Sequence, residues 1–166
     1  MMSEILSEMQ SKEVLIPALL FAALSPGAIL SLPSKAINSL STSPKSVFIH
    51  AAVYAAAVWA AIKYGMEKEV GDYELVVPAL LFIVLSPGLL LQIPPGSIRS
   101  GSTSMISIAV HAVVFAALYA ALRVKFPEKY LKGASLKDDL KNVLPQGGDS
   151  AAQSDSAAPA ADAMSA

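Results

Sequence analysis

The residues with the clearest capacity for chemistry are two histidines, His50 and His111, which lie 61 positions apart in segments without charged side chains. An imidazole can carry a proton near neutral pH, bind a metal ion or hydrogen-bond to the backbone. Because an ionisable group inside an apolar segment is a candidate functional site, proton or ion handling is one hypothesis. The favoured interpretation is structural: a neutral imidazole that hydrogen-bonds to carbonyls freed where a neighbouring helix breaks.

The second pair of candidate sites is a Ser-Pro-Gly tripeptide, found at Ser25-Pro26-Gly27 and again at Ser86-Pro87-Gly88. Proline lacks an N–H and biases the residue before it away from the helical conformation. A helix that reaches either tripeptide must therefore kink or stop there. In an apolar environment the freed backbone groups need protein, hydroxyl or water partners, so each break is expected to face another helix.

Other residue patterns that carry chemistry are missing from the sequence. It has no cysteine, no carboxylate inside its apolar segments, no glycine-rich phosphate loop and no nucleophile elbow, so we expect no enzymatic activity and no catalytic residue. Two histidines without a buried carboxylate or thiolate are a poor metal site, and we expect neither a metal nor another cofactor. The net charge of −1, without a basic stripe, argues against a nucleic-acid partner.

Both sets of candidate residues belong to a tandem repeat with a constant offset of 61 positions. The run Pro17-Ala18-Leu19-Leu20-Phe21 returns as Pro78-Ala79-Leu80-Leu81-Phe82, and Ser41-Thr42-Ser43 returns as Ser102-Thr103-Ser104. About half of residues 17–56 are identical to their counterparts without a gap, which indicates an internal duplication.

The elements that position these residues are predicted to be membrane-spanning helices. Hydrophobic residues make up 54% of the chain and charged residues 15%, and the charges leave four long uncharged segments, 14–34, 46–62, 75–98 and 100–122. About 20 apolar residues suffice for a helix to cross a bilayer. The sequence therefore predicts an all-α integral membrane protein with four transmembrane helices, arranged as two parallel two-span repeats. The first helix of each repeat is kinked or broken at Ser-Pro-Gly.

Charge and apolar character divide the chain into six parts. These are a polar N-terminal segment (1–13), repeat 1 (14–64), a charged linker (65–74), repeat 2 (75–125), a basic post-membrane segment (126–144) and a disordered tail (145–166). A short amphipathic helix is expected over 135–144, Ser43 is an expected N-cap, and Thr103 and Ser104 are expected to cap the equivalent helix of the second copy. Alanines recur every four residues in the second helix of each repeat, so we expect these two helices to pack centrally.

The distribution of basic residues predicts the orientation. One side of the predicted spans carries Lys12, Lys63, Lys68, Arg123, Lys125, Lys129 and Lys132, and the other side carries Lys35, Lys45 and Arg99. Cytoplasmic loops are enriched in such residues, so both termini are expected in the cytosol, or in the stroma of a plastid. Residues 1–13 resemble neither a cleavable signal nor a transit peptide, and the first span is expected to direct insertion itself.

Repeat 2 resembles a small family of plant transmembrane proteins whose shared unit is the domain of unknown function 3339. The resemblance rests on the run Leu85-Ser86-Pro87-Gly88-Leu89-Leu90-Leu91-Gln92-Ile93-Pro94, followed by Thr103-Ser104 and Val110-His111. Repeat 1 matches more loosely, with Ala28, Ser31 and Leu32 where the family has Leu, Gln and Ile. The family unit has two spans, so the resemblance implies a doubled, multi-pass membrane protein of the green lineage. It implies no activity.

These observations leave three hypotheses for the function. The first is a non-enzymatic scaffold, assembly factor or accessory subunit of a membrane complex, with lipids and other membrane subunits, or further copies of itself, as partners. The second is a small oligomeric transporter or channel whose path runs beside the broken helices and His50 and His111. The third is a protein that organises lipids or shapes the membrane.

Overall fold

The computed structural model describes residues 1–31, 36–37, 42–93, 97–98, 103–131 and 136–143, which are almost entirely helical. The chain divides into two compact units, Met1–Ser135 and Leu136–Ala166, and each is described by itself. The first unit contains helices α1 (Met2–Met9), α2 (Lys12–Leu24), α3 (Pro44–Ala60), α4 (Asp72–Leu85), α5 (Met105–Lys125) and α6 (Pro127–Leu131), with a π-helical turn, Ala61–Gly65, extending α3. The second contains α7 (Leu136–Val143), where the sequence predicts a short helix.

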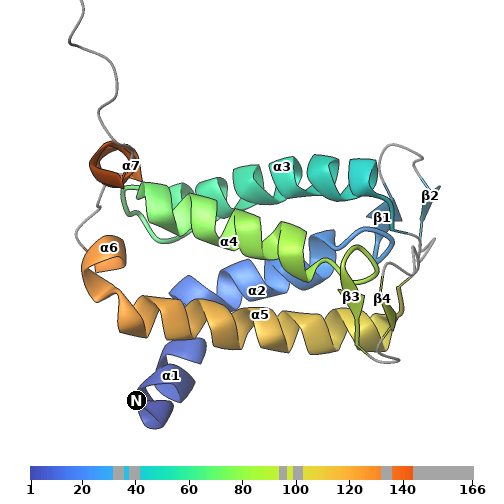
Figure 1. Ribbon diagram of the computed structural model, residues 1–166, viewed down its shortest axis with the longest axis horizontal. Helices are drawn as coiled ribbons and strands as arrows, with labels where there is room; N and C mark the ends of the chain where they lie inside the picture. Colours follow the sequence, from blue (N-terminus) through green and yellow to red (C-terminus); the bar gives the residue numbers. More distant parts are fainter. Residues whose placement is uncertain (32–35, 38–41, 94–96, 99–102, 132–135, 144–166) are drawn as a thin grey trace, which may run out of the picture. The chain divides into compact units, whose positions relative to one another are not determined.

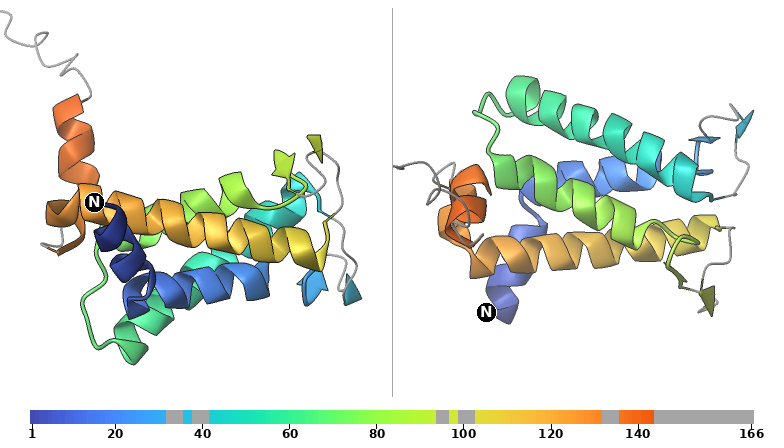
Figure 2. Two further views of the ribbon diagram at one scale, coloured as in Figure 1. Left: turned by 90° about the horizontal axis from the view of Figure 1, so that it is seen from below. Right: turned by 45° about the horizontal axis from the view of Figure 1, so that its top comes forward.

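Helices α2, α3, α4 and α5 form a bundle in which each of α2 and α4 packs against both α3 and α5 (Figure 1). Helices α3 and α5 lie on opposite sides of this bundle (Figure 2). The expectation that the two alanine-rich helices pack centrally is therefore wrong, because α3 and α5 each pack against both α2 and α4 and no helix of the four lies inside the others. Both broken helices carry freed carbonyls at their ends, and contact with two longer helices lets these neighbours cover the carbonyls.

The bundle's core is a cluster of aromatic rings contributed equally by the two repeats. Phe21 and Phe82 are repeat equivalents, as are Tyr54 and Phe115, and all four side chains are fully buried. The Phe21 ring stacks on Phe115 at 5.0 Å and the Tyr54 ring stacks on Phe82 at 4.6 Å, so both stacked pairs join one repeat to the other. Such stacking adds to the hydrophobic gain from burial.

The Ser-Pro-Gly tripeptides end their helices, so of the two predicted alternatives the structure has a break and no kink. Helix α2 stops at Leu24, and Ser25 has extended ψ of 132°, while its hydroxyl donates to the carbonyl of Phe21 at 2.8 Å. In repeat 2 the hydroxyl of Ser86 donates to the carbonyl of Phe82 at 2.7 Å. Proline leaves the last turn without its next N–H donor, and the serine hydroxyl supplies a replacement.

After each break the chain forms a short antiparallel ladder at the same end of the bundle. Strand β1 (Leu30–Ser31) pairs with β2 (Ala36–Ile37), and β3 (Leu91–Gln92) pairs with β4 (Ser97–Ile98). At the other end α1 packs across α5, and α6 follows the last turn of α5 (Figure 2). The predicted tail, 145–166, lies outside the described residues.

Two helices are long and apolar enough to cross a membrane: Pro44–Gly65, which includes the π-helical turn, and Met105–Lys125. Helices α2 and α4 have 13 and 14 residues, which corresponds to about 20 Å at 1.5 Å per residue, against a hydrocarbon core of about 30 Å. The uncharged segment 14–34, expected as the first span, is therefore not one continuous helix, because α2 ends at Leu24. The break at Ser25 shortens it.

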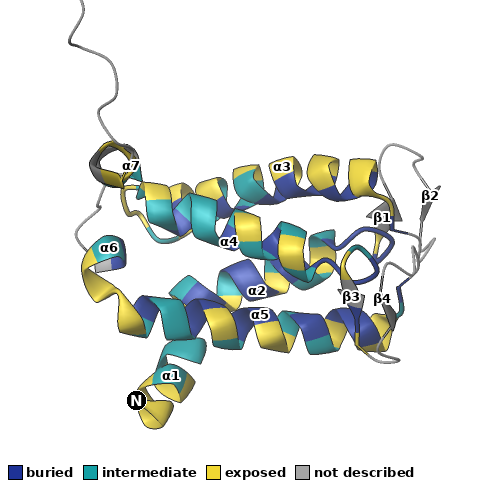
Figure 3. Cartoon of the chain, in the orientation of Figure 1, coloured by how far each residue is buried: buried dark blue, intermediate teal, exposed yellow. Residues whose placement is uncertain are grey.

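Each bundle helix has exposed positions on its outer side (Figure 3), and many of these positions carry large hydrophobic side chains. They are Leu15, Leu19, Phe48, Ile49, Val53, Trp59, Leu80, Val84, Met105, Ile106, Val113, Val114 and Leu118. Exposed apolar residues scattered singly are common in soluble proteins, whereas large apolar patches mark sites of contact with a membrane or another protein.

Candidate functional site

His111 joins the broken end of α4 to the ladder that follows it. Its Nδ1 lies 2.6 Å from the carbonyl oxygen of Leu85, and its Nε2 lies 3.1 Å from the backbone nitrogen of Ile93. A carbonyl can only accept a hydrogen bond and a backbone N–H can only donate one, so Nδ1 carries the proton and Nε2 accepts. The geometry therefore requires a neutral imidazole, and the side chain is 4% exposed.

His50 makes the equivalent contact in repeat 1. Its Nδ1 lies 2.7 Å from the carbonyl oxygen of Leu24, the last residue of α2, and the residue is 3% exposed. As at His111, the carbonyl requires that Nδ1 carries the proton. Both histidines thus lie where the structural hypothesis puts them, with a ring nitrogen on a carbonyl that the Ser-Pro-Gly break has freed.

Hydroxyl groups complete the polar region around the two breaks. Thr42 donates to the carbonyl of Pro87 at 3.0 Å, which links the start of α3 to the break in the other repeat. Ser43 and Ser104 accept from the backbone N–H of the third residue of their helices, at 3.2 and 3.0 Å, as N-caps do. Three further hydroxyls, those of Ser46, Thr103 and Ser107, are buried without a hydrogen-bond partner among the described residues.

This polar region holds backbone groups in place and has little capacity for other chemistry. The part of the chain that the structure describes has no group of three histidine, cysteine or carboxylate side chains that could hold a metal ion. Gly27 and Gly88 both have φ near +85°, at 85° and 86°, which lets the chain reverse after each proline. All eight candidate residues from the sequence therefore lie at the two breaks, at one end of the bundle.

The opposite end of the bundle contains a charged cluster that the sequence analysis did not single out. Arg123, in the last turn of α5, is buried, with its side chain 7% exposed. Its Nε donates to Glu8 Oε1 at 2.7 Å, and its Nη1 lies 3.5 Å from Glu74 Oε1. The guanidinium also lies 5.8 Å from the ring centre of Tyr119 and 5.2 Å from that of Tyr130, within range of cation–π attraction.

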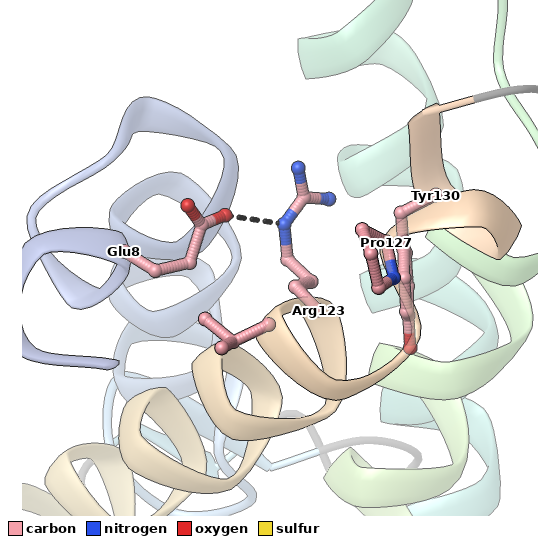
Figure 4. A pocket seen from close by; sticks show the side chains of 5 residues that line it. Glu8, Arg123, Pro127 and Tyr130 are labelled. Atoms are coloured by element: carbon pink, nitrogen blue, oxygen red, sulfur yellow. Dashed lines mark hydrogen bonds and ion pairs between the residues drawn. The ribbon is translucent and has the colours of Figure 1, made fainter. Parts of the chain in front are cut away.

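A pocket of about 180 Å³ opens beside this guanidinium (Figure 4). It is lined by Glu8 of α1, Arg123 and Val124 of α5, and Pro127 and Tyr130 of α6. Burial raises the pKa of Tyr130 to about 12, so its hydroxyl keeps its proton over the physiological range. The pocket thus combines a cation, a carboxylate, a neutral phenol and two apolar side chains.

The arginine and the two tyrosines of this cluster have no counterparts in the first copy of the repeat. The repeat equivalents of Arg123, Tyr119 and Tyr130 are Ile62, Val58 and Glu69, 61 positions earlier. The loss of repeat identity at these three positions is the feature of the sequence that could have pointed to the cluster. From the sequence, Arg123 contributes only to the predicted membrane orientation, because its partners Glu8 and Glu74 are distant in the chain.

The fold and the break sites define a class: a helical protein built from two copies of a two-helix unit, each with a polar break clamped by a histidine. The family model described as "Protein of unknown function (DUF3339)" matches the chain twice, at residues 9–62 and 72–127. The chain therefore belongs to this family, as a tandem duplication of its unit. Neither a curated protein nor a solved structure matches it.

Proposed function

We propose that this protein is a non-enzymatic, multi-pass membrane protein that acts as a scaffold, assembly factor or accessory subunit of a membrane complex. The observation that carries the proposal is the engagement of both nitrogens of His111 by backbone groups. An imidazole held in this way has no lone pair or proton to offer a passing ion. The polar residues of the breaks thus stabilise the fold, and the outward apolar faces are available for contact.

The membrane placement is supported by the two long apolar helices and by the apolar exterior of the bundle. In this arrangement all four bundle helices lie in the bilayer, and α2 and α4 cross it together with the irregular chain that follows each break. Non-helical backbone is tolerated at membrane depth only where protein covers it. Ser25, Ser86, His50 and His111 supply such cover at the broken helix ends.

A path through the centre of one molecule is the competing proposal, and the core packing opposes it. The four rings of Phe21, Tyr54, Phe82 and Phe115 fill the middle of the bundle and are fully buried. A path for solutes therefore has to run between copies of the protein. We retain the lipid-organising role as a third alternative, which predicts altered membrane form on overexpression.

The test is purification of the tagged full chain in a gentle detergent, followed by native mass spectrometry. We expect a stoichiometric complex with other membrane subunits. Two matched pairs of surface variants locate the contact: Phe48→Ala with Val53→Ala on α3, and Ile106→Ala with Val113→Ala on α5. These residues are 60%, 42%, 67% and 61% exposed, so truncating their side chains leaves the core intact.

We expect one pair to release the partner and the other pair to retain it. Recovery of a symmetric oligomer without other subunits would contradict the scaffold and favour a path between copies. In that case His50→Ala and His111→Ala should abolish a flux in liposomes while the protein remains abundant.

A further inference from the structure

The pocket beside Arg123 contains hydrogen-bonding groups that the fold does not use. Nε of the guanidinium is held by Glu8, and its terminal nitrogens point away from this carboxylate (Figure 4). A guanidinium has five N–H donors. The contacts to Glu8, to Glu74 at 3.5 Å and to the hydroxyl of Tyr119 engage three of them, which leaves two donors without a partner in the described part of the chain. A buried guanidinium edge with unused donors matches the geometry of a phosphate or carboxylate oxygen pair.

The carboxylate in the pocket also has capacity left. Both hydrogen bonds that reach Glu8 within the described residues, from Ser11 and from Arg123, go to Oε1, so Oε2 has no partner there. Glu8 is 28% exposed and lines the pocket, so Oε2 is able to accept from a bound ammonium group. The ring of Tyr130 forms an adjacent wall, and its cation–π contact is already made by Arg123, at 5.2 Å from the ring centre, so Glu8 Oε2 is the group that would hold a second cation.

The local charge selects between ligand classes. Glu8, Glu74 and Arg123 together carry a formal charge of −1, from two carboxylates and one guanidinium. A simple anion therefore meets net repulsion from these three groups, and a simple cation leaves the remaining guanidinium donors unused. A ligand with both a phosphate and an ammonium group satisfies the donors and the acceptor together, and it adds no net charge.

We propose that this pocket binds a zwitterionic phosphate–amine group of the phosphoethanolamine class. The phosphate lies against the remaining N–H donors of Arg123, and the ammonium lies against Glu8 Oε2. Two sources have this chemistry, a phospholipid headgroup and a soluble glycerophosphodiester. The lipid source rests on the proposed membrane placement, because Arg123 lies in the last turn of a helix long enough to cross a bilayer. The soluble source does not.

Binding is measured on the full chain, delipidated in a non-ionic detergent, by titration with glycerophosphoethanolamine, glycerol 3-phosphate or ethanolamine. We expect glycerophosphoethanolamine to bind at least about tenfold more tightly than either single-charge probe, since each half of the ligand forms a charge-assisted contact. The lipid arm uses nanodiscs of equal phosphatidylethanolamine and phosphatidylglycerol, with native mass spectrometry of the released protein. Phosphatidylethanolamine should be the lipid retained.

Variants separate binding from a structural ion pair. Glu8→Gln keeps an amide oxygen that accepts from Nε but removes the charge, so it should weaken glycerophosphoethanolamine by about tenfold or more and leave glycerol 3-phosphate unweakened. Its matched control is Glu13→Gln, which removes a carboxylate paired with Lys68 outside the pocket. Val124→Trp fills the pocket and leaves both charged residues in place, so it should abolish binding. Leu118→Trp adds a similar bulk at an exposed position of the same helix and should bind normally.

The outcomes decide the proposal. Retention of lipid without binding of the soluble diester identifies the membrane as the source, and the reverse identifies a soluble ligand. Absence of binding in both arms would overturn the proposal, as would equal affinity for glycerophosphoethanolamine and glycerol 3-phosphate. Tighter binding of glycerophosphoethanolamine by Glu8→Gln, or normal binding by Val124→Trp, would also overturn it. Because the soluble arm requires no bilayer, its result stands even if the protein proves not to span a membrane.

Discussion

At the scale of single residues, each histidine side chain hydrogen-bonds to a backbone carbonyl that the helix break leaves without a helical N–H partner. His111, itself buried, accepts the N–H of Ile93 and donates to the carbonyl of Leu85 in two partly buried hydrogen bonds. We expect His111→Ala to lower the free energy of unfolding by about 1–3 kcal/mol, because it removes both hydrogen bonds and leaves a partly buried donor and acceptor without this partner. Thermal unfolding of the purified protein in detergent measures the loss.

The matched variant is His111→Asn, whose side-chain amide N–H lies near the position of Nδ1 and can still donate to Leu85. It should recover part of the stability that His111→Ala loses. A His111→Ala protein of unchanged stability would contradict the structural role of the imidazole and reopen the hypothesis of proton or ion handling.

The ion pair between Glu13 and Lys68 predicts a pH dependence. The hydrogen bond from Lys68 lowers the pKa of Glu13 below its ordinary value of 4.5. A carboxyl whose pKa falls on folding stabilises the folded state above its unfolded pKa, and this contribution is lost as the pH falls through the folded pKa. Stability should therefore decrease as the pH drops below about 4.5, by about 1 kcal/mol or less because the pair is partly exposed.

Unfolding midpoints between neutral and acidic pH, measured in parallel on the wild type and Glu13→Gln, test this dependence. The variant should show a shallower decline below pH 4.5 than the wild type. Glu67→Gln removes a neighbouring charge outside the pair and should leave the slope unchanged. If the unfolding midpoints of the wild type and Glu13→Gln fall equally as the pH decreases, another carboxylate causes the loss of stability at acidic pH.

At the scale of elements, the Ser-Pro-Gly breaks depend on glycine. Gly27 and Gly88 have φ of 85° and 86°, a region that costs other residues about 1–2 kcal/mol. Gly27→Ala and Gly88→Ala should each lower the free energy of unfolding by about this amount. Denaturation in detergent, followed by helical circular dichroism, measures the change.

Gly65 provides the internal control, because it ends the π-helical turn after α3 and a Cβ there meets no atom within 4 Å. Gly65→Ala should be neutral or stabilising by up to about 1 kcal/mol, since alanine favours helix over glycine. A similar loss in all three variants would mean that the reversal after each proline does not require a left-handed residue.

At the scale of the whole molecule, the helices of the two repeats pack mainly against each other. Helix α2 of repeat 1 packs against α5 of repeat 2, and α3 packs against α4, and the stacked rings of the core also cross between repeats. We expect the halves to stay together after a protease site inserted at Glu67, in the linker, is cut. Co-purification of the two fragments in a gentle detergent measures this association.

A matched variant tests the role of the core in that association. Phe21→Ala removes a ring that contacts Phe82 and Phe115, both in repeat 2, and it should weaken the association of the cut halves. Leu19→Ala, at a position 67% exposed on the same helix, should not. Separation of the fragments directly after cleavage, without denaturant, would contradict this packing of the two repeats against each other.

The sequence by itself determined the features that depend on neighbours along the chain. The duplication, the N-caps at Ser43 and Ser104 and the break before each Pro-Gly follow from local backbone chemistry, since a proline acts on the turn that precedes it wherever the helix packs. It also suggested that a histidine would meet the freed carbonyls, because an apolar surrounding leaves few other partners for either group.

Only the tertiary structure decided which surfaces meet. The pairing of helices across the repeats and the placement of Arg123 beside Glu8 and Glu74 join residues that are far apart in sequence. Alanine spacing misled us about the packing, because it shows which helix faces can approach closely and does not show the partner. The partner of a helix is selected by complementarity between surfaces that are distant in sequence. The residue spacing within one helix does not contain this information.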